Sequence, residues 1–93
     1  MSTGAVRALL HGRVQGVYFR DYAKRKALAL SLVGYARNLP NGVTVEVYAE
    51  GEEADLKSLI AELHQGPGTA RVDRVEAEWQ QPRGELDTFE VVW

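Results

Sequence analysis

The sequence contains no cysteine, which excludes a disulfide framework, a thiolate nucleophile and a cysteine-based zinc or iron–sulfur site. Long apolar runs are missing as well, since no stretch approaches the length of a membrane span. The first eight residues include one basic residue and no apolar run of the kind that marks a secretory signal. We therefore expect a cytoplasmic protein, without a membrane partner, whose stability comes from packing alone.

Neither sign of charge is in large excess. The 11 basic and 13 acidic residues give a formal net charge of −2, so the chain has no overall attraction for nucleic acid or for an anionic membrane surface. At 93 residues, with 45% hydrophobic and 26% charged residues, it has the size and composition of one compact globular domain. We expect a single domain over residues 1–93 that is a monomer.

The hydrophobic pattern predicts two helices and five strands. Apolar residues alternate over 6–11, 43–49, 75–79 and 89–91, and 33–39 also has the character of a strand. They recur at three-and-four spacing over 19–30 and again between Gly51 and Gly66, which predicts amphipathic helices. Pro40, Asn41 and Gly42 form a turn signal that joins two of the strands in a hairpin.

The predicted order is strand, helix, strand, strand, helix, strand, with a short strand appended at the C-terminus. Two amphipathic helices and an alternating sheet can bury their apolar sides only against each other. The expected fold is therefore α+β, a ferredoxin-like two-layer sandwich (βαββαβ plus the extra strand) with both helices on one face of a mainly antiparallel sheet.

The segment Gly12-Arg13-Val14-Gln15-Gly16-Val17-Tyr18-Phe19-Arg20 lies between the first strand and the first helix. The helix begins there without Ser, Thr, Asp or Asn to accept hydrogen bonds from its first amides. Free amides at a helix N-terminus attract a phosphate-like anion, and Arg20 could bind two phosphate oxygens through its planar guanidinium. An equally good interpretation from spacing alone is a tight glycine connection followed by a solvated arginine, because the segment matches neither the GxGxxG nor the P-loop pattern.

Three sequence blocks together resemble the acylphosphatase family. They are GRVQGVYFR at 12–20, GYARNLPNGVTVEVYAEG at 34–51 and the pattern GP-x-x-A-x-V-x-x-V at 66–75, so the resemblance covers nearly the whole chain. It implies an enzyme that hydrolyses the carboxyl–phosphate anhydride of small acyl phosphates, with no metal or other cofactor. Two departures are Ser31, where similar sequences usually have glycine, and Tyr35, where tryptophan is frequent. A left-handed Ser31 would cost about 1 kcal/mol.

The resemblance also implies roles for individual residues. Arg20 matches the phosphate-binding arginine, and Asn38 matches the asparagine that positions the attacking water. The main-chain amides of Gln15, Gly16, Val17, Tyr18 and Phe19, together with Arg20, match the phosphate cradle. Few groups suffice for this chemistry, because the leaving carboxylate has a conjugate acid with a pKa of about 4 and needs no general acid. The loose transition state of phosphoryl transfer depends mainly on positioning and charge stabilisation.

Other chemically suggestive residues have simpler interpretations. We expect His11 to be a structural or surface residue and Asp21 to pair with Lys24 or Arg25. The acids over 50–55 are typical of a helix N-terminus and a solvated face rather than a magnesium site. We expect the aromatic side chains Trp79, Phe89 and Trp93 to lie in the core or at a sheet edge.

Two other functions are compatible with the same order of elements. RNA-recognition domains share it, but the strand over 43–50 has one aromatic residue and two acids, so we expect no nucleic-acid partner. A non-catalytic acylphosphatase-like module that binds a phosphorylated partner is the other alternative. Because no second domain is present in these 93 residues, we expect a free-standing enzyme.

Overall fold

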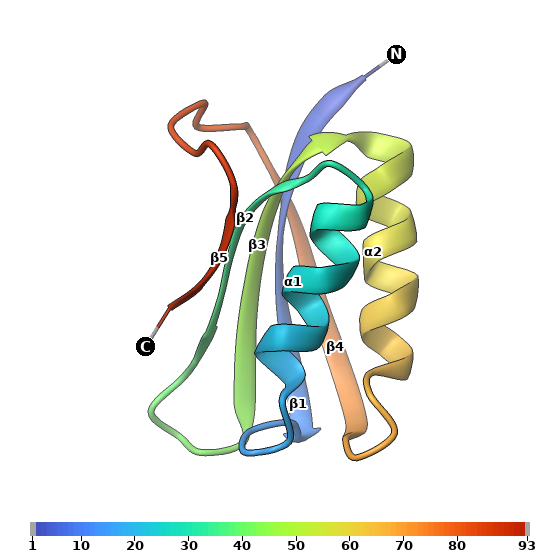
Figure 1. Ribbon diagram of the computed structural model, residues 1–93, viewed down its shortest axis with the longest axis vertical. Helices are drawn as coiled ribbons and strands as arrows, with labels where there is room; N and C mark the ends of the chain where they lie inside the picture. Colours follow the sequence, from blue (N-terminus) through green and yellow to red (C-terminus); the bar gives the residue numbers. More distant parts are fainter. Residues whose placement is uncertain (1, 93) are drawn as a thin grey trace.

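The computed structural model describes residues 2–92, so the expectation for Trp93 lies outside the described residues. Seven elements follow one another along this part of the chain (Figure 1). They are β1 (Thr3–Arg13), α1 (Phe19–Ala29), β2 (Val33–Asn38), β3 (Thr44–Glu52), α2 (Glu53–Gln65), β4 (Arg71–Gln80) and β5 (Phe89–Val92).

The strands form one sheet in the order β4-β1-β3-β2-β5. The pairs β1–β3, β1–β4 and β2–β3 are antiparallel, and the short C-terminal β5 pairs with β2 in parallel. Both helices cover the same face of the sheet (Figure 1). The ferredoxin-like sandwich and the 33–49 hairpin that the sequence predicts are therefore confirmed.

Several strands are longer than their apolar alternation predicts. β1 begins at Thr3, β3 continues to Glu52, and β4 begins at Arg71. Strand β1 pairs with a neighbour on each side, and main-chain hydrogen bonding extends a strand regardless of whether its side chains are apolar. One consequence is that Gly51 belongs to β3 and does not introduce α2.

The core lies between the sheet and the two helices. Its buried side chains include Val6, Ala8 and Leu10 of β1, Val45 and Val47 of β3, Phe19, Ala23 and Ala27 of α1, Leu56, Leu59 and Leu63 of α2, and Phe89 of β5. Trp79 is instead 47% exposed on the edge strand β4. Phe89 therefore occupies the core and Trp79 the edge, as expected.

Helix α1 ends in a Schellman motif. The N–H of Leu32 donates to the carbonyl of Ala27 at 2.9 Å, and the N–H of Ser31 donates to Leu28 at 3.0 Å. Ser31 has φ 57°, in the left-handed region that glycine adopts without steric cost. Ser31 is therefore left-handed, which is the condition under which we expect it to cost about 1 kcal/mol.

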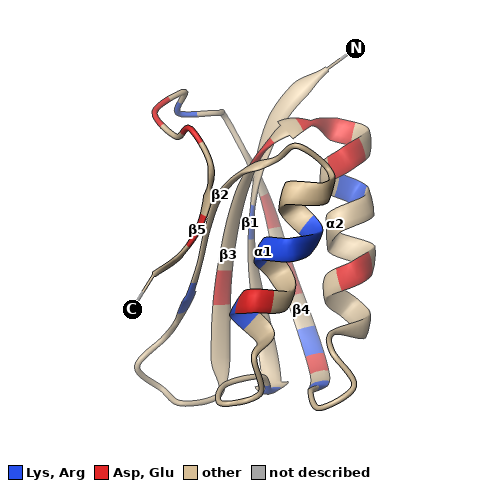
Figure 2. Ribbon diagram, viewed as in Figure 1, with Lys and Arg blue, Asp and Glu red and all other residues tan. Residues whose placement is uncertain are grey.

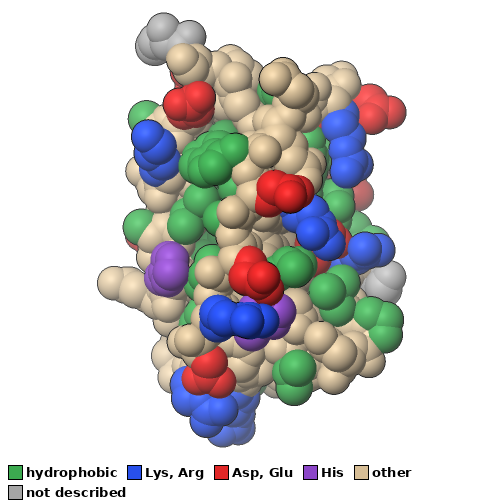
Figure 3. All heavy atoms as spheres, turned by 180° about the vertical axis from the view of Figure 1, so that it is seen from behind, with side chains coloured by type: hydrophobic (Ala, Val, Ile, Leu, Met, Phe, Trp, Pro, Cys, Tyr) green, Lys and Arg blue, Asp and Glu red, His purple; other side chains and the backbone are tan. Residues whose placement is uncertain are grey.

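Acidic and basic residues are spread along the strands and helices (Figure 2), and charged side chains of both signs lie on the face of the sheet away from the helices (Figure 3). The buried carboxylate of Glu46 accepts hydrogen bonds from the guanidinium groups of Arg7 and Arg37. A buried carboxylate needs such partners, because isolated burial of its charge is strongly unfavourable.

A second buried carboxylate corrects the prediction that the acids over 50–55 form a solvated face. Glu50 is only 6% exposed. It accepts hydrogen bonds from the Tyr48 hydroxyl at 2.6 Å and from the main-chain N–H of Arg83 at 2.7 Å, which ties the β4–β5 loop to the sheet. Burial opposes ionisation of Glu50, yet these hydrogen bonds lower its pKa. Burial, reinforced by Glu50, raises the pKa of Tyr48 to about 12.

No helix within residues 2–92 is long and apolar enough to cross a membrane.

Candidate active site

The two glycines of the 12–20 segment have different local roles. Gly12 has φ 139°, and a Cβ atom placed there would lie 2.3 Å from the main-chain oxygen of Arg71. Gly12 therefore permits the close contact of β1 with β4, where the pairing register shifts between His11 and Gly12. Gly16 has φ 74° and open space around it, so it is the residue that turns the loop.

Loop 14–18, which connects β1 to α1, is fastened on both sides. The side-chain Nε2 of Gln15 donates to the carbonyls of Leu39 and Thr44, both at 2.8 Å, on the β2–β3 hairpin. From the α2–β4 loop, the Thr69 hydroxyl donates to the Val17 carbonyl at 3.0 Å. Val17 is itself buried in the core. The loop is thus held by groups that do not occupy the main-chain amides at its tip.

Those amides point to an anion site. Tyr18, the N-cap residue of α1, has φ 61° and ψ 27° and gives no side-chain hydrogen bond to the first turn. The first helical bond runs from the N–H of Tyr22 to the Tyr18 carbonyl at 3.1 Å. Within residues 2–92 the main-chain N–H groups of 15–19 make no hydrogen bond. Unpaired amides at the positive end of a helix dipole are a favourable site for a phosphate group.

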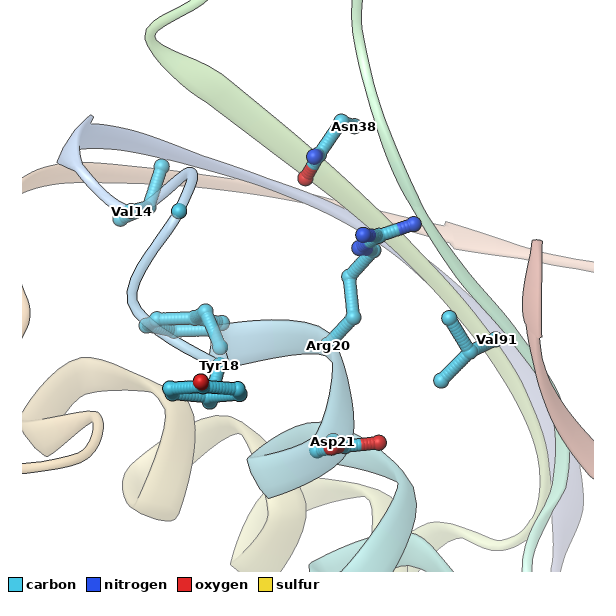
Figure 4. Close-up of a pocket in the computed structure, with 8 residues that line it drawn as sticks. Val14, Tyr18, Arg20, Asp21, Asn38 and Val91 are labelled. Atoms are coloured by element: carbon cyan, nitrogen blue, oxygen red, sulfur yellow. The ribbon is translucent and has the colours of Figure 1, made fainter. Parts of the chain in front are cut away.

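Arg20 and Asn38 line one pocket of about 370 Å³ with part of this loop. In Figure 4 the guanidinium of Arg20 and the side-chain amide of Asn38 both extend into the space between the loop and β5. Nη1 of Arg20 donates to the main-chain oxygen of Val92 at 3.1 Å. The side-chain oxygen Oδ1 of Asn38 is buried and has no hydrogen-bond partner within residues 2–92. A buried carbonyl oxygen without a partner is unfavourable, so Asn38 is poised to accept a hydrogen bond from a molecule in the pocket.

The predicted site residues do not all face this pocket. Gly16, Tyr18, Phe19, Arg20 and Asn38 line it. The side chain of Gln15 faces the hairpin, and that of Val17 faces the core. Gln15 and Val17 are not among the residues that line the pocket, so their place in an amide cradle stays a prediction.

Three further residues line the pocket: Val14, Asp21 and Val91. We predicted a surface ion pair for Asp21 and no site role for any of the three. The predicted ion pair of Asp21 with Lys24 or Arg25 is not among the salt bridges formed by residues 2–92. The position of Asp21 in the first turn of α1, next to Arg20 in the sequence, is the one feature that could have predicted its place in the pocket. Val91 comes from the far end of the chain, and no local pattern connects it with the loop.

His11 lies outside the pocket, on the open face of the sheet. Its Nε2 is 2.6 Å from the Glu76 carboxylate, and its Nδ1 is 3.0 Å from the Thr44 hydroxyl. The expectation of a structural histidine is confirmed. No group of three or more histidine or acidic side chains in the described part of the chain is arranged to hold a metal ion.

Comparisons with known proteins give the family. The acylphosphatase family model matches residues 6–91. The chain is 52% identical over 77 residues to the acylphosphatase of Thermus thermophilus. This alignment covers 83% of this chain and 86% of that protein. The crystal structure of acylphosphatase from Bacillus subtilis superimposes with a TM-score of 0.92 at 29% identity, covering 97% of this chain and 99% of that one.

A larger protein contains the same fold. The crystal structure of T. kodakarensis HypF superimposes with a TM-score of 0.83 at 33% identity and covers 97% of this chain, but only 12% of the HypF chain. The family match extends over most of the present chain and includes both the loop and the residues that line the pocket with it. The chain therefore belongs to the acylphosphatase family of hydrolases.

Proposed function

We propose that the chain hydrolyses the carboxyl–phosphate anhydride of small acyl phosphates by in-line attack of water, without a metal ion. The observation that carries the proposal is that Arg20 and Asn38, whose buried Oδ1 has no partner within residues 2–92, line one pocket together with Gly16, Tyr18 and Phe19 of the loop. The loop and Arg20 supply positive charge for a phosphoryl group, and Asn38 supplies a hydrogen-bond acceptor for water.

The phosphoryl group would lie on the loop. Its oxygens would accept hydrogen bonds from the amides of Gln15, Gly16, Val17, Tyr18 and Phe19 and from the guanidinium of Arg20. The dipole of α1 adds to this field. In a loose transition state the charge is distributed over the equatorial oxygens, and preorganised donors stabilise that charge without reorganising during the reaction.

Asn38 would orient the nucleophile. Its Oδ1 accepts a hydrogen bond from water, and its Nδ2 can donate to a phosphoryl oxygen, which fixes the water on one side of the phosphorus. The new bond forms between the water oxygen and phosphorus. The bond from phosphorus to the carboxyl oxygen breaks, and its electron pair leaves with the carboxylate. An acyl phosphate dianion and one water thus give a carboxylate and a dihydrogen phosphate ion.

The leaving group explains why no acid is needed in the pocket. A carboxylate whose conjugate acid has a pKa of about 4 leaves without protonation near neutral pH. Asp21 is the one carboxylate among the lining residues, and the mechanism gives it no proton to transfer. We propose further that the chain works as a cytoplasmic monomer with no nucleic-acid partner, in keeping with its net charge of −2.

Arg20→Lys tests the proposal, with benzoyl phosphate as substrate and inorganic phosphate as competitive inhibitor. Lysine keeps the charge but loses the planar two-oxygen contact, so kcat/KM should fall and the inhibition constant for phosphate should rise, each by about tenfold or more. Arg25→Lys, an exposed change on the same helix, is the matched control. Values for Arg20→Lys equal to those of the control would remove Arg20 from the site.

The alternative function is a non-catalytic module that binds a phosphorylated partner. It is favoured by the fold match within HypF, where the equivalent domain is a small part of a longer chain. The same assay distinguishes the two functions. Tight phosphate binding with no hydrolysis of benzoyl phosphate above the spontaneous rate would indicate the binding module.

A further inference from the structure

Tyr18 is an exposed aromatic residue held at the edge of the pocket. Its side chain is 81% exposed, the largest exposed fraction among the large hydrophobic residues within 2–92. Its neighbours Val17 and Phe19 are both buried, and the Val17 carbonyl accepts a hydrogen bond from the Thr69 hydroxyl. The position of Tyr18 is therefore fixed from both sides while its ring remains in solvent.

Folding gains little from this arrangement. The ring buries almost none of its apolar surface, so it adds little hydrophobic stabilisation. Its main chain has φ 61°, a left-handed conformation that is unfavourable for a residue with a side chain. A strained, exposed aromatic residue that lines a pocket points to a role in that pocket rather than in the fold.

The direction of attack gives the role. An in-line displacement places the attacking water and the leaving oxygen on opposite sides of phosphorus. Figure 4 shows Asn38 and Tyr18 on opposite sides of the pocket, with the guanidinium of Arg20 extending toward Asn38. If Asn38 holds the water, the acyl group leaves on the side where Tyr18 lies.

We propose that Tyr18 is a specificity-determining residue that contacts the acyl group and favours substrates with a planar, apolar acyl group. This inference rests on the proposed function. The exposed ring offers an aromatic face on which an aryl group can stack or pack edge to face. A small acyl group such as acetyl presents little surface to that ring, so its turnover should depend on the phosphate site alone.

The test compares the hydrolysis of benzoyl phosphate and of acetyl phosphate by the unmodified chain and by Tyr18→Ala. We expect the ratio of kcat/KM for benzoyl phosphate to kcat/KM for acetyl phosphate to fall by a factor of about 3 to 10, the range of one aromatic contact. Any disturbance of the amide cradle in this variant acts on both substrates through their common phosphoryl group, so it cancels in the ratio of the two kcat/KM values. Tyr18→Phe should retain the discrimination of the unmodified chain, because the contact uses the ring and not the hydroxyl.

Leu28→Ala is the matched control, because Leu28 is a half-exposed apolar residue of α1 that does not line the pocket. A fall that is equal for both substrates in Tyr18→Ala would assign Tyr18 to loop geometry and overturn the inference, as would no change for either. Hydrolysis of neither substrate by the unmodified chain would instead overturn the proposed function. Thermal melting of Tyr18→Ala should match that of the unmodified chain, since the ring is exposed.

Discussion

Gln15→Leu is expected to weaken both the fold and the catalytic site. Nε2 of Gln15 donates to the Leu39 carbonyl and to the Thr44 carbonyl, both at 2.8 Å. These two bonds join loop 14–18 to the β2–β3 hairpin, one of them at the residue that follows Asn38. Leucine has a similar size but no donor. The Thr44 carbonyl keeps the N–H of Leu39 as a partner at 2.9 Å, and the Leu39 carbonyl keeps the N–H of Gly42 at 3.4 Å, so neither carbonyl is left without a donor.

Two hydrogen bonds with net contributions of roughly 0.5–1.5 kcal/mol each give a loss of about 1–3 kcal/mol. Because Gln15 is half-buried, water can replace part of the interaction, and we expect the lower half of that range. For a domain of this size, the melting temperature should fall by about 4–8 °C per kcal/mol.

Gln15→Leu should reduce activity more than its small loss of stability alone would. The two bonds set the separation between the amide cradle and Asn38, and a displacement of about 1 Å between reacting groups can reduce the rate by as much as 100-fold. We expect kcat for benzoyl phosphate to fall at least tenfold at a temperature where the variant is folded.

Gln65→Leu is the matched control, since Gln65 is exposed at the end of α2 and its side chain makes no hydrogen bond within residues 2–92. A Gln15→Leu protein with the melting temperature and kcat of this control would refute the reasoning.

Three further outcomes are expected. Ser31→Gly should stabilise the fold by about 1 kcal/mol in a denaturant titration, because it removes a left-handed serine; an unchanged or lower stability would contradict the Schellman geometry. The pKa of Tyr48 is raised from 10.0 to about 12, so its protonated form stabilises the folded chain. That contribution, on the order of 2 kcal/mol, should be complete below pH 10 and lost as pH rises from 10 to 12. Between pH 10 and 12, the unfolding free energy of Tyr48→Phe, measured by denaturant titration, should fall less than that of the unmodified chain. The same pH profile in both proteins would contradict this contribution of Tyr48. Treatment with EDTA should leave hydrolysis of benzoyl phosphate intact, whereas loss of turnover that magnesium restores would exclude a site charged by protein groups alone.

The spacing of apolar residues along the sequence predicted the fold well, because each helix and strand buries one apolar face. The alternation of Val6, Ala8 and Leu10 and the stripe of Leu56, Leu59 and Leu63 correspond to residues that are buried against each other. Strand ends were predicted less well, because Thr3 and Glu52 pair through main-chain hydrogen bonds that side-chain hydropathy does not report. The burial of Glu50 was missed for a related reason, since its partners Arg83 and Gly84 lie more than thirty residues away.

The candidate site was predicted only in part from local sequence. The absence of a capping side chain before α1 follows from the residue types of the 12–20 segment, whereas the expectation for Ser31 came from the family resemblance. The tether from Gln15 to the hairpin and the contribution of Val91 to the pocket depend on how distant strands pair. Those contacts have no local pattern, and they appear only when the sheet is assembled.

The most direct test of the proposed mechanism is Asn38→Ala, measured as kcat for benzoyl phosphate and as competitive inhibition by inorganic phosphate. The side-chain oxygen of Asn38 has no partner within residues 2–92, so its loss should not destabilise the hairpin. Asn41→Ala is the control for a hairpin role, because Asn41 bonds the Thr44 hydroxyl and the N–H of Val43.

If Asn38 orients the water while Arg20 and the amides hold phosphate, kcat should fall by a factor of roughly 100 or more, with the phosphate inhibition constant and the melting temperature nearly unchanged. Asn41→Ala should lower the melting temperature and keep kcat. A folded Asn38→Ala protein with a normal kcat would contradict the mechanism.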